Sequence, residues 1–115
     1  MRLMRFIENW QKVVHDQNVK NGFYDGEGSQ DLHRKLLLII SEICEAQEEL
    51  RAGHKPEEIY FNPGSDKPEG FSIELADASI RIMDILQFVG VNLETAMNLK
   101  HDYNLTRPHL HNKKF

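Results

Sequence analysis

The fold of this chain is decided by two acidic stretches, Ser41-Glu42-Ile43-Cys44-Glu45-Ala46 and Phe71-Ser72-Ile73-Glu74-Leu75-Ala76-Asp77. Each stretch places two carboxylates three residues apart in a run that is otherwise mostly apolar. Positions i and i+3 of a helix share one face, with Cβ atoms roughly 5–6 Å apart. The two carboxylates of each stretch are therefore expected to point the same way.

If the two helices pack with these faces opposed, Glu42, Glu45, Glu74 and Asp77 converge on one small volume. Like charges at that distance repel each other unless a cation neutralises them. Mg²⁺ is the expected cation, with Mn²⁺ as the alternative, because hard cations take oxygen ligands. Solvated helix faces are the competing interpretation, since acids at this spacing are common on exposed helices.

A first helix is expected from residue 3 to about residue 14, fading near Asn18, because apolar residues recur there at helical spacing. A glycine-rich loop follows at residues 21–28. Trp10 and Phe23 can stack on a base, as aromatic side chains do in nucleotide sites. Burial of Trp10 in the core is the alternative, in line with the usual burial of tryptophan.

Ser29 is the expected N-cap of a second helix that runs to about Ala52, with Gly53 as the glycine that follows its end. The buried stripe of this helix is predicted to contain Leu32, Leu36, Ile39, Ile40, Ile43, Ala46 and Leu50. Residues 54–69 then form a long connection with three of the four prolines and one expected helical turn at residues 56–59.

A third helix is expected at residues 69–89, with apolar residues on nearly every side, a pattern typical of a buried helix. A narrow stripe of charged residues interrupts the apolar surface: Glu74, Asp77, Arg81 and Asp84. Unpaired charges on a buried helix are costly, so these residues need a partner, a metal or a water-filled cleft.

A fourth helix is expected to begin after Asn92 and to run to about Tyr103. Its inward face is predicted to carry Leu93, Ala96, Met97, Lys100 and Asn104. A lysine and an amide on such a face indicate a polar cleft at the open end of the bundle. The whole chain, residues 1–115, is therefore predicted to be a single all-α domain of four to five helices.

Three motifs together carry a family resemblance: ExxE at residues 42–45, ExxD at residues 74–77 and KxxxN at residues 100–104. As a set they resemble the MazG-like family of all-α nucleoside triphosphate pyrophosphohydrolases, over about residues 29–115. The resemblance implies Mg²⁺ at the four carboxylates and phosphate contacts from Lys100 and Asn104. It also implies a homodimer or homotetramer whose active sites can draw residues from a neighbouring subunit.

The implied reaction is hydrolysis of a (deoxy)nucleoside triphosphate between its α- and β-phosphates, which gives a monophosphate and pyrophosphate. Glu45 or Glu42 is expected to orient or deprotonate the attacking water. Arg107 is a further candidate for phosphate contact, with a solvated terminal arginine as the alternative. The rival hypothesis is a non-catalytic helical module that binds a nucleotide or a partner. The presence of all four acids and of Lys100 argues against that rival, because an inactive site need not retain every ligand.

Composition and charge bear on the binding partners and the cellular location to expect. The formal net charge of -4 argues against a general nucleic-acid binder, which would show a basic face. No apolar run approaches the length of a membrane span, and no secretory signal is visible at the N-terminus. The single cysteine, Cys44, cannot form an internal disulfide, so a reduced, cytoplasmic protein is expected.

Overall fold

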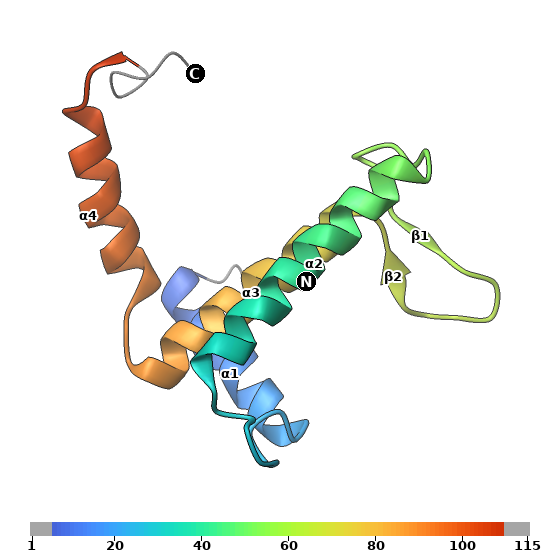
Figure 1. Ribbon diagram of the computed structural model, residues 1–115, viewed down its shortest axis with the longest axis horizontal. Helices are drawn as coiled ribbons and strands as arrows, with labels where there is room; N and C mark the ends of the chain where they lie inside the picture. The colour runs from blue at the N-terminus through green and yellow to red at the C-terminus, as the bar shows by residue number, and fades with distance from the viewer. Residues whose placement is uncertain (1–5, 110–115) are drawn as a thin grey trace.

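The computed structural model describes residues 6–109. This part of the chain contains four helices and one short hairpin, in the order α1 (Ile7–Lys20), α2 (Leu32–Arg51), β1 (Tyr60–Phe61), β2 (Pro68–Glu69), α3 (Phe71–Val89) and α4 (Leu93–Leu105) (Figure 1). The prediction of a mostly helical protein is confirmed. The antiparallel pair β1–β2, in which Tyr60 lies opposite Glu69, was not predicted.

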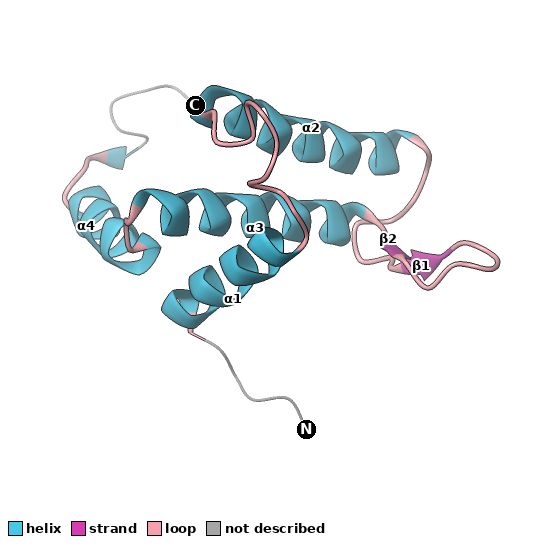
Figure 2. Ribbon diagram, turned by 90° about the horizontal axis from the view of Figure 1, so that it is seen from below, coloured by secondary structure: helices cyan, strands magenta, loops and turns pink. Residues whose placement is uncertain are grey.

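The helices pack around α3. Figure 2 shows α2 lying alongside α3 and α1 crossing the opposite side of α3 at an angle. The apolar side chains that are almost completely buried are Val14, Ile39, Ala46 and Ala78, which come from all three of these helices. Small residues at two of these positions allow α2 and α3 to approach each other closely.

A buried glutamine fastens α1 to the turn between α3 and α4. Gln11 is only 1% exposed, and its Nε2 donates to the Val91 carbonyl at 2.8 Å. Its Oε1 accepts a hydrogen bond from the Leu93 backbone N–H at 2.9 Å. Leu93 is the first residue of α4, whose N–H has no partner within the helix, so one side chain satisfies two backbone groups of the turn.

Two predicted helix starts are wrong, and the structure explains both. Asp31, not Ser29, caps α2, because its Oδ1 accepts from the His33 N–H at 3.0 Å. Helix α3 begins at Phe71 and not at residue 69, because residues 68 and 69 pair with β1. Gly70 lies between the strand and the helix with a φ of +139°, which favours glycine.

The ends of α1 and α2 and the start of α4 lie close to their predicted positions. Helix α1 ends later than predicted, at Lys20, and the first residues of the predicted helix lie outside the described residues. Gly53 follows α2 with a φ of +92°, as predicted for a glycine after a helix end. A single turn closes between the Glu58 N–H and the Lys55 carbonyl at 3.0 Å. Asn92 caps α4, accepting from the Thr95 N–H at 2.9 Å, as predicted.

Predicted burial is wrong on a large part of the surface. Leu36, Ile40 and Ile43 were assigned to the buried stripe of α2, yet they are 53%, 54% and 50% exposed. Helix α3 is also not covered on every side, since Ile82 is 39% exposed. The radius of gyration is 16.9 Å, whereas a compact domain of this length has about 13 Å. One chain therefore leaves much of its apolar surface uncovered.

Helix α4 departs most from its predicted position. None of its residues is buried, and Met97, on its predicted inward face, is 50% exposed. In Figure 1 the helix extends away from the α2–α3 pair. The predicted inward face of α4 is therefore wrong within one chain. Among the helices of residues 6–109, none is both long enough and apolar enough to cross a membrane.

Candidate metal centre

The two acidic stretches meet where α2 packs against α3. Carboxylate oxygens of Glu42, Glu45 and Glu74 lie within 4.8 Å of one another. The i and i+3 spacing on α2 turns two carboxylates toward α3, and Ala46 and Ala78 lie buried in the same packing. The predicted convergence of acids from two helices is thus present, and three of the four predicted ligands share one centre.

Glu74 is the most deeply buried acid of this centre, at 6% exposure. Burial, together with hydrogen bonds to Glu45 and Glu42 and the charges of those two groups, raises the pKa of Glu74 to about 7. A carboxyl group in this position holds a proton near neutral pH unless a cation replaces it. The ionised form of Glu74, at the middle of the centre, is therefore destabilised unless a cation is bound.

Asp77, the fourth predicted ligand, lies one helical turn from Glu74 at the margin of the centre. Burial and the charge of Glu42 raise its pKa, while Arg81 and Lys67 act in the opposite direction. The Arg81 Nε donates to Glu42 Oε1 at 3.1 Å, so one arginine already balances part of the acidic charge. The charges of Glu42 and Glu45 both raise the pKa of Asp77. Its carboxylate oxygens, however, do not belong to the group of oxygens that lie within 4.8 Å of one another.

Two acids that were not predicted as metal ligands lie at the hairpin end of the centre. Oxygens of Glu49, Glu69 and Glu74 form a second group within 4.8 Å, so Glu74 belongs to both groups. Lys67 reaches this end, with its Nζ 3.4 Å from Glu69 Oε1. The position of Glu49 follows from Glu45 by one helical turn, but that of Glu69 depends on a hairpin that no sequence pattern indicated.

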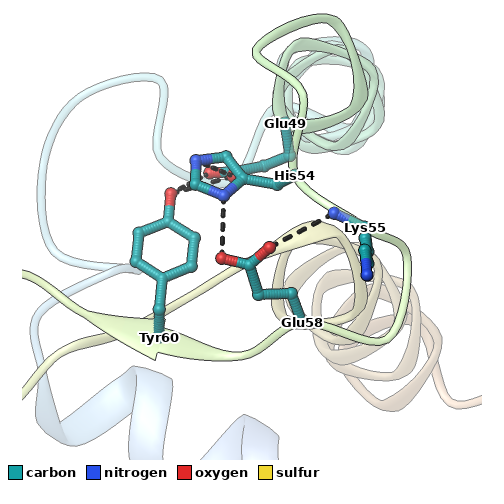
Figure 3. Close-up of polar contacts among 5 residues, drawn as sticks. All are labelled: Glu49, His54, Lys55, Glu58 and Tyr60. Atoms are coloured by element: carbon teal, nitrogen blue, oxygen red, sulfur yellow. Dashed lines mark hydrogen bonds and ion pairs between the residues drawn. The ribbon is translucent and has the colours of Figure 1, made fainter.

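A cluster of side chains fastens the hairpin to the end of α2 (Figure 3). The Tyr60 hydroxyl donates to Glu49 Oε2 at 2.8 Å, and this hydrogen bond raises the pKa of Tyr60 to about 12. The rings of His54 and Tyr60 stack at 4.5 Å, and His54 Nδ1 lies 3.0 Å from Glu58 Oε2. Glu58 also accepts from the Lys55 backbone N–H. These contacts hold Glu69 beside the acidic centre.

Asp84, the last acid of the predicted charged stripe, is satisfied by protein groups. It is 4% exposed, and its two oxygens lie 2.8 Å from His15 Nδ1 and 2.8 Å from the Tyr24 hydroxyl. Burial and the hydrogen bond to Asp84 raise the pKa of Tyr24. The expected need for a partner is met here by a histidine and a tyrosine, so Asp84 has a structural role between α1 and α3.

The predicted phosphate-binding residues do not join the acids within one chain. Lys100, Asn104 and Arg107 lie on or just after α4, which follows the far end of α3 from Glu74 (Figure 1). Gly90, which follows the end of α3, lies sixteen residues after Glu74, a distance of about 24 Å along the helix axis. Both Lys100 and Arg107 lie instead over the Tyr103 ring, at 5.0 Å and 5.5 Å from its centroid.

Trp10, the predicted base-stacking residue, does approach the centre. It is 37% exposed and lines a cavity of about 510 Å³ together with Phe23, Asp77 and Arg81. Full burial in the core, the alternative for Trp10, is therefore wrong. An aromatic cavity adjoins the acidic centre, as a nucleotide site would require.

The donor set suits a hard divalent cation. All the groups that converge are carboxylates, and oxygen ligands are those that Mg²⁺ and Mn²⁺ take in proteins. A cation would also remove the repulsion that raises the pKa of Glu74. Glu42, Glu45 and Glu74, with Asp77 beside them, are thus the residues that could hold the metal.

No protein-family model matches this chain, and no curated protein or solved structure matches it either. The likeness to the MazG-like family therefore rests on the three motifs alone.

Proposed function

We propose that this protein is a MazG-like, Mg²⁺-dependent nucleoside triphosphate pyrophosphohydrolase, which cleaves its substrate between the α- and β-phosphates. One observation carries the proposal: carboxylates from two helices converge around the buried Glu74, whose pKa burial raises to about 7. When bound there, Mg²⁺ would neutralise the triphosphate and polarise the bond that is cleaved.

Glu45 is the better candidate for the residue that activates water. Its side chain is exposed, whereas Glu42 is held by Arg81 at 3.1 Å and its side chain is only 13% exposed. A carboxylate that faces solvent can orient a water molecule and accept its proton. Glu42 and Glu74 would then serve mainly as metal ligands, with Asp77 completing the set.

Lys100 and Asn104 are proposed to act on the phosphates of a substrate bound to another copy of the chain. They lie far from the acids of their own chain, and α4 has no buried residue. The apolar face of α2, formed by Leu36, Ile40 and Ile43, is available for a dimer or tetramer contact. The family resemblance implies the same arrangement, with active sites shared between subunits.

A pyrophosphate-release screen over all common ribo- and deoxynucleoside triphosphates, with Mg²⁺, tests the reaction. The wild-type protein is expected to release pyrophosphate from at least one of them, and Glu45→Gln and Asp77→Asn are expected to abolish release while remaining folded. Glu48→Gln is the matched control, because Glu48 lies on the same helix, is exposed and pairs with the exposed Arg51. Nucleotide binding without turnover would favour the non-catalytic module, and full activity in Glu45→Gln and Asp77→Asn would remove the metal-site assignment.

Mixing two inactive variants tests the shared site. Glu45→Gln and Lys100→Ala should each be inactive alone, and a mixture that has exchanged subunits should recover part of the wild-type rate. Recovery occurs because some sites in the mixed oligomer receive a wild-type glutamate from one chain and a wild-type lysine from the other. A mixture that exchanges subunits and stays inactive contradicts action of Lys100 between chains.

A further inference from the structure

A side-chain amide that makes no hydrogen bond to the described residues lines the cavity beside the acidic centre. Asn18 is 9% exposed and lines the same cavity of about 510 Å³ as Trp10 and Phe23. Within residues 6–109, no hydrogen bond is made by its side chain. Among residues 6–109, Ser29 Oγ is the side-chain atom that is fully buried without a hydrogen-bond partner, so the polar atoms of Asn18 still reach solvent and can pair with a ligand.

The end of helix α1 holds Asn18 in this position. The Phe23 N–H donates to the Asn18 carbonyl at 3.0 Å, and the Gly22 N–H donates to the Val19 carbonyl at 3.1 Å. This pair of bonds is a Schellman motif, and Gly22 adopts the positive φ of +84° that the motif requires. The backbone carbonyl of Asn18 is therefore satisfied, and Phe23 is brought back against the last turn of α1. Only the side-chain amide is left to interact with a ligand.

The cavity has the dimensions and the lining of a nucleobase site. Its volume lies within the roughly 300–1,000 Å³ of small-molecule sites, and Trp10 and Phe23 supply aromatic surface. All nucleobases can stack on aromatic side chains, so the two aromatic residues would supply affinity but little selectivity among bases. Selectivity needs a polar group, and an amide offers one donor and one acceptor side by side.

The neighbouring Gln17 is less suited to that task. It also lines the cavity, but it is exposed, and its Nε2 already donates to Asn21 Oδ1 at 3.0 Å. Buried polar groups discriminate between ligands more strongly than exposed ones, because a ligand that fails to pair with them leaves them unsatisfied. Among the polar residues that line this cavity, Asn18 is the one that is buried and could discriminate between ligands in this way.

The cavity that Asn18 lines also borders the acidic centre. Asp77 and Arg81 line it, and Arg81 is hydrogen-bonded to Glu42. A nucleotide with its base against Asn18 would thus occupy the same cavity as Asp77 and Arg81.

We propose that Asn18 is the base-reading residue of this protein, pairing through its amide with the hydrogen-bonding edge of a nucleobase held between Trp10 and Phe23. This inference rests on the proposed nucleotide substrate. It assigns selection of the base to the last turn of α1, whereas the phosphates are handled at the interface of α2 and α3.

Binding of free nucleosides, which have no phosphates and need no metal, separates this inference from catalysis. Nuclear magnetic resonance can follow the side-chain amide signals of Asn18, assigned by their loss in Asn18→Asp. On titration with adenosine, guanosine, cytidine, uridine and thymidine, these signals are expected to shift, and to do so at the lowest concentration for one nucleoside. Absence of a shift with all five would overturn the inference, including the case in which the cavity holds only water.

Substitution provides the second test. Asn18→Leu is expected to weaken binding of the preferred nucleoside at least about tenfold and to level the differences among bases. Asn9→Leu is the matched control, because Asn9 is an exposed asparagine of the same helix that does not line the cavity. Unchanged affinity and selectivity in a folded Asn18→Leu protein would refute the role of Asn18.

The two proposals fail in distinguishable ways. Nucleoside binding that depends on Asn18, without pyrophosphate release from any triphosphate, upholds base reading and contradicts the enzymatic proposal. Pyrophosphate release with the same base preference in wild type and in Asn18→Leu upholds the enzyme and contradicts base reading by Asn18.

Discussion

Replacement of Glu74 by glutamine should remove a specific pH dependence of stability in the metal-free protein. Burial and the neighbouring Glu45 and Glu42 raise the pKa of Glu74 from 4.5 to about 7. Because the folded pKa is the higher one, the protonated group favours folding, fully below about pH 4.5. That contribution is lost as the pH rises through about 7.

The size of the effect follows from the two pKa values. Each difference of one between the folded and unfolded pKa corresponds to about 1.4 kcal/mol, so the shift from 4.5 to about 7 sets a ceiling of about 3.5 kcal/mol. Coupling to Glu42 and Glu45 and access of solvent reduce the expected loss to about 1–3 kcal/mol between pH 5 and pH 8. Glutamine keeps the shape of the protonated carboxyl and cannot ionise, so this loss should be absent in Glu74→Gln.

Urea unfolding followed by helical circular dichroism, with a chelator present, measures the free energy of unfolding at each pH. Glu48→Gln serves as the control and should keep the wild-type dependence, since Glu48 is exposed and lies outside the centre. Mg²⁺ should restore the lost stability at pH 8, because a cation that binds only the folded state stabilises it. The reasoning is refuted if Glu74→Gln keeps the wild-type pH profile.

The acidic centre could be predicted from the sequence because it depends on local geometry. The i and i+3 spacing fixes which carboxylates share a helix face, and the apolar surroundings of Glu74 indicated that its face is turned inward. Asn92 and Gly53 were recognised for the same reason, since capping depends only on a few neighbouring residues.

Features that depend on distant parts of the chain could not be predicted in this way. Glu69 joins the centre only because the hairpin folds back onto α2, and its pairing with Tyr60 leaves no periodic signal in so short a strand. The position of Lys100 depends on the direction in which α4 leaves the turn after Gly90. Helical periodicity identified the apolar side of α2 but not whether the same chain would cover Ile40.

Three further predictions concern how the scaffold holds the site. Gln11→Leu should lower the free energy of unfolding by about 2 kcal/mol, because it leaves the Val91 carbonyl and the Leu93 N–H without their partner; an unchanged urea midpoint would contradict this. Gly70→Ala should place a methyl group against the Glu58 carbonyl oxygen and loosen the hairpin, which hydrogen exchange at residues 60–69 would detect as faster exchange. Glu49→Gln should lower the pKa of Tyr60 from about 12 toward 10, as followed by its ring resonances; a value that stays near 12 would show that Glu49 is not the cause.

Anomalous diffraction from crystals grown with Mn²⁺ tests most directly whether the acids of α2 and α3 form a metal centre. We predict a peak among the carboxylates of Glu42, Glu45 and Glu74, with oxygen ligands at roughly 2.0–2.6 Å, the range of oxygen-bound divalent cations. A well-ordered Mn²⁺ crystal with no peak there, or with these carboxylates turned away from one another, would contradict the account.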